Sequence, residues 1–459
     1  MSLTLTEQFA HFVAGVSLAD VPQAARDKAR DCILDCIGCE IAGSAEAIRE
    51  PVLQYIDAVG GAPQATLVGS GRRTSITNAA LANGTFGHVL DYDDTNQIFI
   101  GHGSVVIVPA IFALAEHLGR SGEDILLAYM VGTEIQWKFG EALVACGDHY
   151  GKGWHSTCTI GAFGAAASAA KLLGLTEAQM VHAFGIAASE AGGFQEQFGT
   201  HCKPFHAGRA NEIGVRAALL AKGGFTSART ALEGKVGFLK LVAERHDLSK
   251  VSNFGKPWGI LEPSFGRGIN LKANPVCASG VGGIEGMQSL IAKHGLRADE
   301  VESIECGVRE HALNILMYHQ PRNGLEAKFS AEYWMAATLV DGRVGLKQVT
   351  DEVVLKPEIQ ALIPKVKVYG DPAISTAKAR VDIKLKTTDG RTLTESYYPP
   401  KGAADNPMSE AELVAKFREC AAWGGVGDAR AQRALDWLLA LERQASVSGL
   451  VGNLVADAA

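Results

Sequence analysis

The sequence has no long apolar run and no block of basic residues, and it predicts no secretory leader. Its longest apolar stretches are interrupted by glycine, alanine and polar groups, which argues against a membrane span. The formal net charge is −7, from 43 basic against 50 acidic residues, and without a basic run we expect no nucleic-acid partner. The opening MSLTLTEQFAHFVAGVSLAD has no basic segment ahead of an apolar core, so it predicts no signal peptide. We therefore expect a cytoplasmic protein with no membrane partner.

Motifs for common cofactors and metals are also missing. There is no Walker loop, no G-x-S-x-G and no H-E-x-x-H, and GVGGIEG has Glu285 where the dinucleotide motif needs its last glycine. Among the nine cysteines, only Cys32, Cys36 and Cys39 cluster, on one face of a predicted helix, without a fourth ligand at zinc-like spacing. Free cysteines are often buried, so we interpret these three as core residues. We predict neither a cofactor nor a metal.

Helical patterns dominate both ends of the chain. Segments such as 103–119 and 156–174 begin with small or capping residues and stop at glycine, as helices do. Near residue 266 the pattern changes, because VESIECGVRE predicts a strand and the alternating residues around Asp389-Gly390 predict a hairpin. The predicted fold class is mainly α, with a large all-helical domain built from both chain ends and an inserted smaller α+β domain.

The predicted boundaries give three segments. A first helical part covers 1–265, an α+β lid domain covers 266–399, and a second helical part covers 400–459. The inserted segment is called the lid below. A chain of 459 residues is too long for one ordinary core, and a cleft between two domains is a common place for a binding site.

Three carboxylates crowd into HVLDYDDTNQ, residues 88–97, without a lysine or arginine among them. Asp91, Asp93 and Asp94 stand within four positions, and like charges this close push pKa values apart. Aspartate favours turns and helix caps, so an acidic capping loop is the alternative to a functional cluster. The preceding ANGTFGHVL is small and apolar, which favours burial of the segment.

Two histidines stand at the starts of apolar helices. His102 lies in GHGSVV, and His155 lies in GWHSTCT. A helix N-terminus carries partial positive charge, so it disfavours imidazolium and attracts carboxylates. Two such ends facing each other would bind a dianion beside two neutral bases. The alternative is that each histidine merely ends a helix at the surface.

Cationic and titratable groups gather again in GTHCKPFHAGRANEIG, residues 199–214. Lys203 precedes Pro204, which predicts that the helix begins after the proline, with His206 and Arg209 near its start. We assign His206 and Arg209 to substrate binding. A solvated loop is the alternative, and the sequence leaves both interpretations open.

In these segments the sequence resembles the MmgE/PrpD family. The resemblance covers nearly the whole chain, including NGTFGHVLDYDDT, GHGSVVIVPAIFALAE, GWHSTCTIGAFGAAASAAKLLGL and KPFHAGRANEIGVRAALLAKGGFT. It implies a large helical domain with a smaller α+β lid, a homodimer, a small carboxylate substrate and no required cofactor. By matching motif it implies a substrate contact at Thr95 and catalytic roles for Asp91, His102, His155, Lys203 and Tyr318. Asp91 would orient a histidine or relay its proton, and Asp93 and Asp94 would hold the loop.

The segment KANPVCASGVGG departs from the family's pattern. Many members read Pro-Cys-Cys-Arg-x-x-His there, and this sequence has Ala278 at the arginine position and Val281 at the histidine position. A carboxylate-pairing arginine is lost, so we expect a dicarboxylate, or a substrate with one apolar end against Val281, rather than a tricarboxylate. Lys272, which opens the segment, is predicted to bind substrate.

The chemistry that the resemblance implies begins at a proton beside a carboxylate. Removing it needs a base and positive groups that hold the developing charge, which His102, His155 and Lys203 can supply. If a β-hydroxyl then leaves, the enzyme is a dehydratase, which we predict first. Return of the proton to the other face would make an epimerase, and loss of CO₂ a decarboxylase. A non-catalytic scaffold is the remote alternative.

Overall fold

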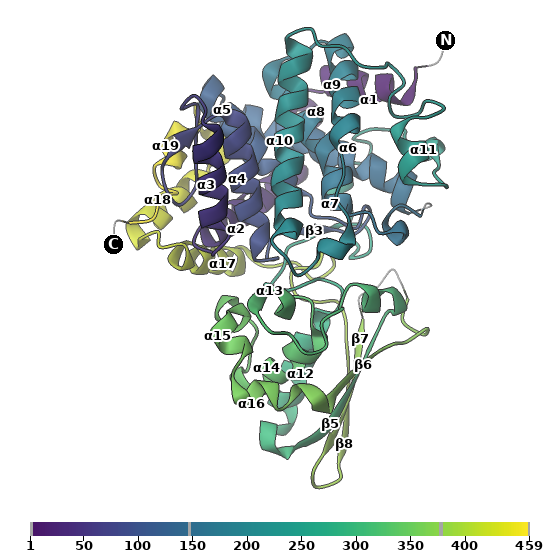
Figure 1. Cartoon of the computed structure of the whole chain (residues 1–459), viewed down its shortest axis with the longest axis vertical. Coiled ribbons are helices and arrows are strands. Elements are labelled where there is room, and N and C mark those ends of the chain that lie inside the picture. The colour runs from purple at the N-terminus through teal and green to yellow at the C-terminus, as the bar shows by residue number, and fades with distance from the viewer. Residues whose placement is uncertain (1–2, 146–147, 376–379, 458–459) are drawn as a thin grey trace.

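The computed structural model describes residues 3–145, 148–375 and 380–457. Figure 1 shows a large helical part and, below it, a smaller part that contains the main sheet. Helices dominate the described residues, which confirms the predicted mainly α fold class. None of the helices in these ranges is long and apolar enough to cross a membrane.

The large part is built from both ends of the chain, as predicted. Its N-terminal helices are α1 (Leu5–Gly15), α2 (Gln23–Gly43), α3 (Arg49–Val59), α4 (Ile76–Val89), α5 (Val108–Leu118), α6 (Gly122–Phe139), α7 (Ser156–Thr159), α8 (Gly161–Leu173), α9 (Glu177–Glu190), α10 (Cys202–Lys222) and α11 (Phe238–Val242). Its C-terminal helices are α17 (Glu410–Trp423), α18 (Asp428–Leu439) and α19 (Ser448–Val451). α17 packs against α2. Cys32, Cys36 and Cys39 are buried on α2, which confirms that they are core residues.

Local capping chemistry explains where these helices begin. Before α17, the Ser409 side chain accepts a hydrogen bond from the backbone N–H of Glu412, whose carboxylate accepts one from the backbone N–H of Ser409. α10 begins at Cys202, ahead of Pro204 and not after it as predicted. Proline is tolerated in a first turn, because the missing N–H has no helical partner there. Lys203 therefore lies inside the first turn of α10.

The lid is built on a four-stranded sheet with the strand order β6–β5–β7–β8. The strands are β5 (Val301–Val308), β6 (Val366–Gly370), β7 (Val381–Thr387) and β8 (Thr392–Tyr397), and only β5 and β6 pair in parallel. Its helices are α12 (Gly282–His294), α13 (Gly324–Ala327), α14 (Ala331–Asp341), α15 (Asp351–Val354) and α16 (Pro357–Gln360), of which α12 packs on β7 and β8. The predicted strand and hairpin are both present, and Gly390 turns the hairpin with φ 89°.

Two clusters of buried apolar side chains correspond to the two parts. The larger joins the N-terminal helices to α17 and α18, and the smaller lies between the lid sheet and α12 and α14. Ile269 and Leu271 pack in the larger cluster although they follow residue 266, and the smaller cluster begins at Val276. The boundaries at 265 and 399 stay a prediction.

Short two-residue strands also tie the segments together. β1 (Ala65–Thr66) pairs with β2 (Arg73–Thr74), and β3 (Thr95–Asn96) pairs with β4 (Ile269–Asn270), both antiparallel. The second pair joins the loop after the Asp cluster to the start of the lid. It therefore fixes the position of the chain that leads to Lys272.

α4 and α10 approach each other closely, which brings the ends of both helices to one place. A Cβ at Gly84 would lie 2.9 Å from the Cα of Gly208, and a Cβ at Gly208 would collide with the backbone oxygen of Leu81. Glycine is required at such a contact because any side chain would separate the helices. His88 at the end of α4 thereby comes next to Lys203 at the start of α10.

Candidate active site

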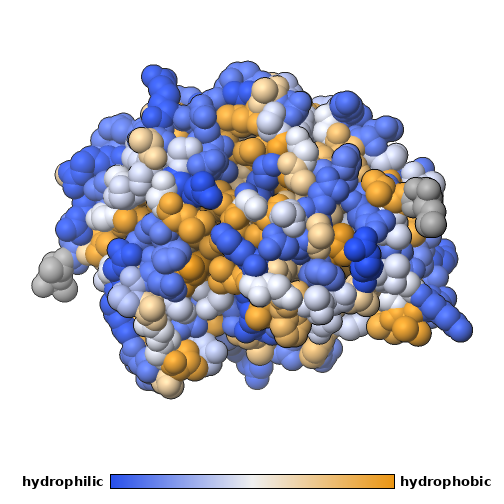
Figure 2. All heavy atoms as spheres, turned by 90° about the horizontal axis from the view of Figure 1, so that it is seen from above, coloured by the Kyte–Doolittle hydropathy of each residue, from blue (hydrophilic) through white to orange (hydrophobic). Residues whose placement is uncertain are grey.

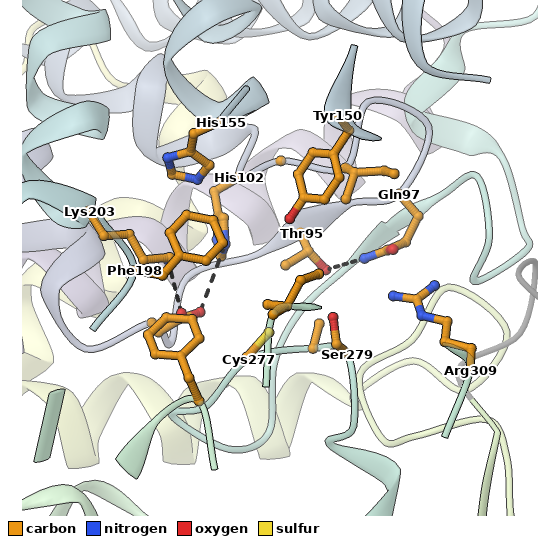
Figure 3. A pocket seen from close by; sticks show the side chains of 16 residues that line it. Thr95, Gln97, His102, Tyr150, His155, Phe198, Lys203, Cys277, Ser279 and Arg309 are labelled. Carbon is orange, nitrogen blue, oxygen red and sulfur yellow. Dashed lines mark hydrogen bonds and ion pairs between the residues drawn. The ribbon is translucent and has the colours of Figure 1, made fainter. Parts of the chain in front are cut away.

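A cavity lies where the helical part meets the lid, and a position between two parts of a protein is common for small-molecule sites. From the helical part it is lined by Asp91, Thr95, His102, His155 and Lys203. From the lid it is lined by Cys277, Ala278, Ser279, Arg309 and Phe329, among others. Figure 3 shows His102, His155 and Lys203 close together, and Arg309 some way from them. The structure thus brings five of the predicted site residues to one wall.

Asp91 lies between two lysines. Its Oδ2 is 2.9 Å from Nζ of Lys203, and Nζ of Lys272 donates to its Oδ1 and, at 2.6 Å, to its backbone oxygen. The backbone of Asp91 is left-handed, with φ 49°, a strained conformation that is common at functional sites. Burial alone would raise the pKa of Asp91, but Lys203 and Lys272 together hold it well below its ordinary value. Asp91 is therefore ionised.

Asp93 holds two histidines. Its carboxylate is 3.0 Å from Nδ1 of His88 and 3.0 Å from Nδ1 of His102, and all three side chains are buried. A carboxylate accepts hydrogen bonds, so it favours the tautomer with the proton on Nδ1 in both rings. We expected Asp91 to orient a histidine and Asp93 to hold the loop. In the structure, Asp93 and not Asp91 makes the short contacts with histidine. The closest distance between Asp91 and His102 is 3.8 Å, from Oδ1 to Nε2.

His102 presents the other ring nitrogen, Nε2, to the site. Burial lowers the pKa of His102 below its ordinary value, which outweighs the opposite effect of Asp93. The lowered pKa agrees with the sequence expectation, but the main cause is burial rather than a helix end. In the tautomer that the nearby Asp93 carboxylate favours, Nδ1 carries the proton and Nε2 is unprotonated at neutral pH. A lone pair in this position can accept a proton from a bound molecule.

His155 forms a second histidine pair. Its Nδ1 is 2.9 Å from Nδ1 of His206, so one ring donates and the other accepts. Burial, followed by the positive charge of Lys203, holds the pKa of His155 well below its ordinary value. The predicted contact of His206 with substrate stays a prediction, because in this structure its contact is with His155.

Lys203 connects Asp91 with His88, one of the two histidines beside Asp93. Its ammonium donates to Nε2 of His88 at 2.8 Å and to Asp91, and lies 5.5 and 5.4 Å from the ring centroids of Phe198 and Phe329. Aromatic faces attract a cation and exclude water from it. The ammonium is thus held in place and shielded at the edge of the cavity.

Asp94 stabilises the loop that carries His102. Its carboxylate accepts from the backbone N–H of Ser104 at 3.1 Å and from the Ser104 hydroxyl, whose oxygen is 2.7 Å from the Tyr129 hydroxyl. Burial raises the pKa of Asp94 to about 7. The contacts agree with the loop-holding role expected for this residue. Asp91, Asp93 and Asp94 therefore have three different environments within four positions.

A buried ion pair supports the loop from behind. Nζ of Lys416 lies 2.6 Å from Oδ1 of Asp35 and donates to the backbone oxygens of Tyr92 and Lys272 at 2.8 and 2.9 Å. Lys416 belongs to α17 and Asp35 to α2. The second helical part thus anchors the two loops that carry Asp91 and Lys272.

Replacing Lys416 by methionine should lower the free energy of unfolding by about 3–5 kcal/mol, since Asp35 would keep a buried, unpaired charge. The surface pair of Lys401 with Glu412 provides a matched control, because Lys401→Met should change stability by only about 0–1 kcal/mol. Urea unfolding of both variants measures the difference. Equal, small changes would show that the buried pair has no stabilising role.

The predicted residues that do not line the cavity are five: Tyr318, His206, Arg209, Lys272 and Val281. The Tyr318 hydroxyl donates to the backbone oxygen of Phe198 at 2.9 Å, behind the wall. Arg209 pairs with Glu190 and Glu212, each at 2.7 Å, on the outer side of α10. Val281 is buried in the lid core just before α12, where its apolar side chain packs with the sheet. We therefore do not retain Arg209 and Val281 as substrate contacts, and Tyr318 contacts the wall only through Phe198.

Sequence reasoning missed His88 and Arg309. His88 stands three residues before Asp91 and was given no role, because its role depends on contacts with Asp93 and with Lys203, 115 positions away. Arg309 lies near the end of VESIECGVRE, which predicted the strand, and directly follows β5 in the structure. A polar residue at a strand end was the available signal, and this end lies on the cavity wall. Arg309 supplies a lid cation although residue 278 is alanine. The physical ground for expecting a dicarboxylate is therefore weaker than the sequence indicated.

The buried cluster also contains side chains of the kinds that bind metal ions. Among the residues that the structure describes, His88, Asp93 and His102 have donor atoms within 4.8 Å of one another. A cation bound there would lie beside the Lys203 ammonium, which already contacts Nε2 of His88, and like charges repel strongly in a buried site. The cluster therefore suits a neutral histidine pair better than a metal ion.

Activity should accordingly survive exhaustive dialysis against a chelator. Turnover before and after dialysis, together with metal analysis of the dialysed protein, measures this. Loss of turnover that one divalent metal restores would contradict the expectation.

A mainly helical protein with buried acid–base residues around one cavity has the arrangement of an enzyme, here of the lyase or isomerase type. The chain belongs to the MmgE/PrpD family, because residues 7–250 match the MmgE/PrpD N-terminal domain and residues 275–441 match the C-terminal domain. This confirms the resemblance described above.

The similar proteins compared below are named either cis-aconitate decarboxylase or 2-methylcitrate dehydratase. The chain is 26% identical to a cis-aconitate decarboxylase from Aspergillus terreus, over 97% of this chain and 95% of that protein. It is 28% identical to a mouse cis-aconitate decarboxylase, over 91% of this chain and 87% of that protein. It is 25% identical to 2-methylcitrate dehydratase from Escherichia coli strain K12, over 86% of each chain.

Proposed function

We propose that this protein is a cofactor-independent lyase of the dehydratase type, which removes a proton beside a carboxylate of a small di- or tricarboxylate. The observation that supports this most is His102, whose Nδ1 faces Asp93 and whose unprotonated Nε2 faces a cavity edged by Lys203. A neutral histidine of lowered pKa is suited to accept a proton first. Dehydration begins with that step.

The proposed sequence uses residues already in place. Nε2 of His102 takes the proton from the carbon, and the electron pair of the broken C–H bond forms the new C=C bond. Lys203 stabilises the negative charge that develops on the adjacent carboxylate. The protonated His102 then gives this proton to the β-hydroxyl, which leaves, so that the products are water and the unsaturated acid.

A decarboxylase is the second candidate, favoured by the names of the relatives that match 91–97% of this chain. There the C–C bond to a carboxylate breaks, CO₂ leaves, and its electron pair shifts along the double bond to a carbon that takes up a proton. The same residues would serve, with a histidine that has first taken up a proton from water giving that proton to the carbon.

Product analysis separates these reactions. Purified protein is offered 2-methylcitrate, cis-aconitate and smaller hydroxydicarboxylates, and products are followed by NMR and by CO₂ release. Loss of water without CO₂ supports the dehydratase, and CO₂ release establishes the decarboxylase. Inversion of a chiral substrate without either product would make the protein an epimerase instead.

Lys203→Ala should lose about 2–4 kcal/mol of transition-state stabilisation in kcat/KM, as for a lost charge-stabilising donor. Lys222→Ala, at the other end of α10, is the matched control and should leave kcat/KM unchanged. The melting temperature of both variants shows whether the fold is intact. An unchanged kcat/KM in a folded Lys203→Ala protein would remove Lys203 from the proposed mechanism.

We further propose a homodimer in the cytoplasm, on the ground of the family resemblance. Light scattering on the purified protein tests the dimer, and cell fractionation tests the compartment. Neither proposal affects the chemistry assigned to the cavity.

A further inference from the structure

The cavity has two charged ends. Lys203 and Lys272 both contact Asp91 at the end that holds His102, so their charge is partly balanced there. Figure 3 shows the Arg309 side chain on the opposite side of the cavity from Lys203 and His155, with its guanidinium directed toward Gln97. A substrate that spans the cavity therefore meets a cation at each end.

The sheet of the lid places Arg309 on this side of the cavity. It directly follows β5, whose Val308 carbonyl accepts a hydrogen bond from the backbone N–H of Asp371. Only 5% of Arg309 is exposed, although it is a charged residue on the cavity wall. Guanidinium stays protonated in proteins, so a permanent positive charge lies at this end.

The neighbours of Arg309 on the wall are polar. Ser279 and Tyr150 carry hydroxyl groups, and Gln97 carries an amide that donates to the Thr95 hydroxyl at 3.3 Å. Hydroxyl and amide groups can donate to a carboxylate that the planar guanidinium binds through two parallel N–H groups. Ala278 lines the same cavity without adding charge, so Arg309 is the lid cation among the described lining residues.

We propose that Arg309 determines specificity by binding the substrate carboxylate furthest from the reacting carbon, so that the cavity prefers tricarboxylates to dicarboxylates. The proposal rests on the proposed function, since it assumes a polycarboxylate whose reacting carbon lies beside His102 and Lys203. It replaces the preference for a dicarboxylate that Ala278 and Val281 indicated. Arg309 does not take part in proton transfer, so its effect is on binding.

Calorimetric binding tests this without turnover. The probes are tricarballylate, which has three carboxylates, and methylsuccinate, which has the same skeleton without one terminal carboxylate. Arg309→Met should weaken tricarballylate binding about 30-fold or more, as expected when a buried charge pair loses one partner, and methylsuccinate binding less than about threefold. Arg297→Met, an exposed lid residue paired with Asp299, is the control and should change neither.

The outcomes are decisive in both directions. Selective loss of tricarballylate binding supports the proposal, and equal loss for both probes, no loss, or no binding by the wild type overturns it. If Arg309→Met does not fold, Arg309→Lys decides, because it keeps the charge but not the two-pronged geometry and should weaken tricarballylate selectively. Selective binding without any lyase activity would keep this inference and reject the proposed function. Lyase activity with unselective Arg309 variants would do the reverse.

Discussion

Asp93→Asn should lower kcat/KM by about 10³- to 10⁴-fold with little change in KM, as when an orienting carboxylate behind a catalytic histidine is replaced by its amide. The physical reason is tautomer control. Asp93 faces Nδ1 of both His88 and His102, so an amide that can donate would favour the tautomer with the proton on Nε2. His102 would then meet the substrate with an N–H instead of a lone pair.

The control for Asp93→Asn is Asp57→Asn, an exposed carboxylate paired with Arg72. It should leave kcat/KM unchanged. Circular dichroism and thermal melting of both variants establish that the fold is kept. A folded Asp93→Asn protein with nearly full activity would show that Asp93 does not control the base.

His102→Gln should lower kcat/KM by about 10²- to 10⁴-fold, the range for a lost general base. Glutamine keeps a polar group of similar length but cannot accept the proton. His117→Gln, at the exposed end of α5, is the matched control and should leave kcat/KM unchanged. Steady-state kinetics with added imidazole measures the effect, and partial recovery of turnover would identify the missing base. Full activity without imidazole would assign the base to another residue.

The pH dependence of the wild type follows from the same residue. The base must be unprotonated, and burial lowers the pKa of His102, so its active form persists as the pH falls below the ordinary histidine range. We expect kcat/KM to be constant from about pH 8 down to about pH 6.5, with the acid limb below that value. An acid limb above pH 7 would be inconsistent with a buried, neutral His102.

Much of the fold could be predicted because its signals are local. Gly390 turns the β7–β8 hairpin where Asp389-Gly390 predicted it, and apolar periodicity located helices at both chain ends. The predicted start of α10 was a few residues too late, because proline restricts a helix interior but not its first turn. Ile269 and Leu271 pack with the helical core, which local pattern could not reveal since both also suit a strand.

The sequence could predict which residues belong to the candidate site better than it could predict their contacts. Family motifs placed Asp91, His102, His155 and Lys203, and all four line the cavity. The motifs could not show which carboxylate faces which histidine, because that depends on the left-handed turn at Asp91.

The remaining contacts of the site could not be predicted because they join residues that are far apart in the sequence. Lys203 and His88 meet only because α4 and α10 cross at two glycines, and Lys416 reaches the site from α17, more than 300 positions after Tyr92. Such partners depend on tertiary packing, which has no local signature. The same is true of Arg309, whose importance depends on the wall it shares with residues of the helical part.

The central claim is that His102 and its neighbours move a proton at a carbon beside a carboxylate. The most direct test is NMR of cis-aconitate incubated with the protein in D₂O, because both hydration and decarboxylation would then add a deuteron to such a carbon. We predict deuterium in the product of the wild type and none above background with folded His102→Gln. Product formed without deuterium, or deuterium incorporated equally by His102→Gln, would contradict the account.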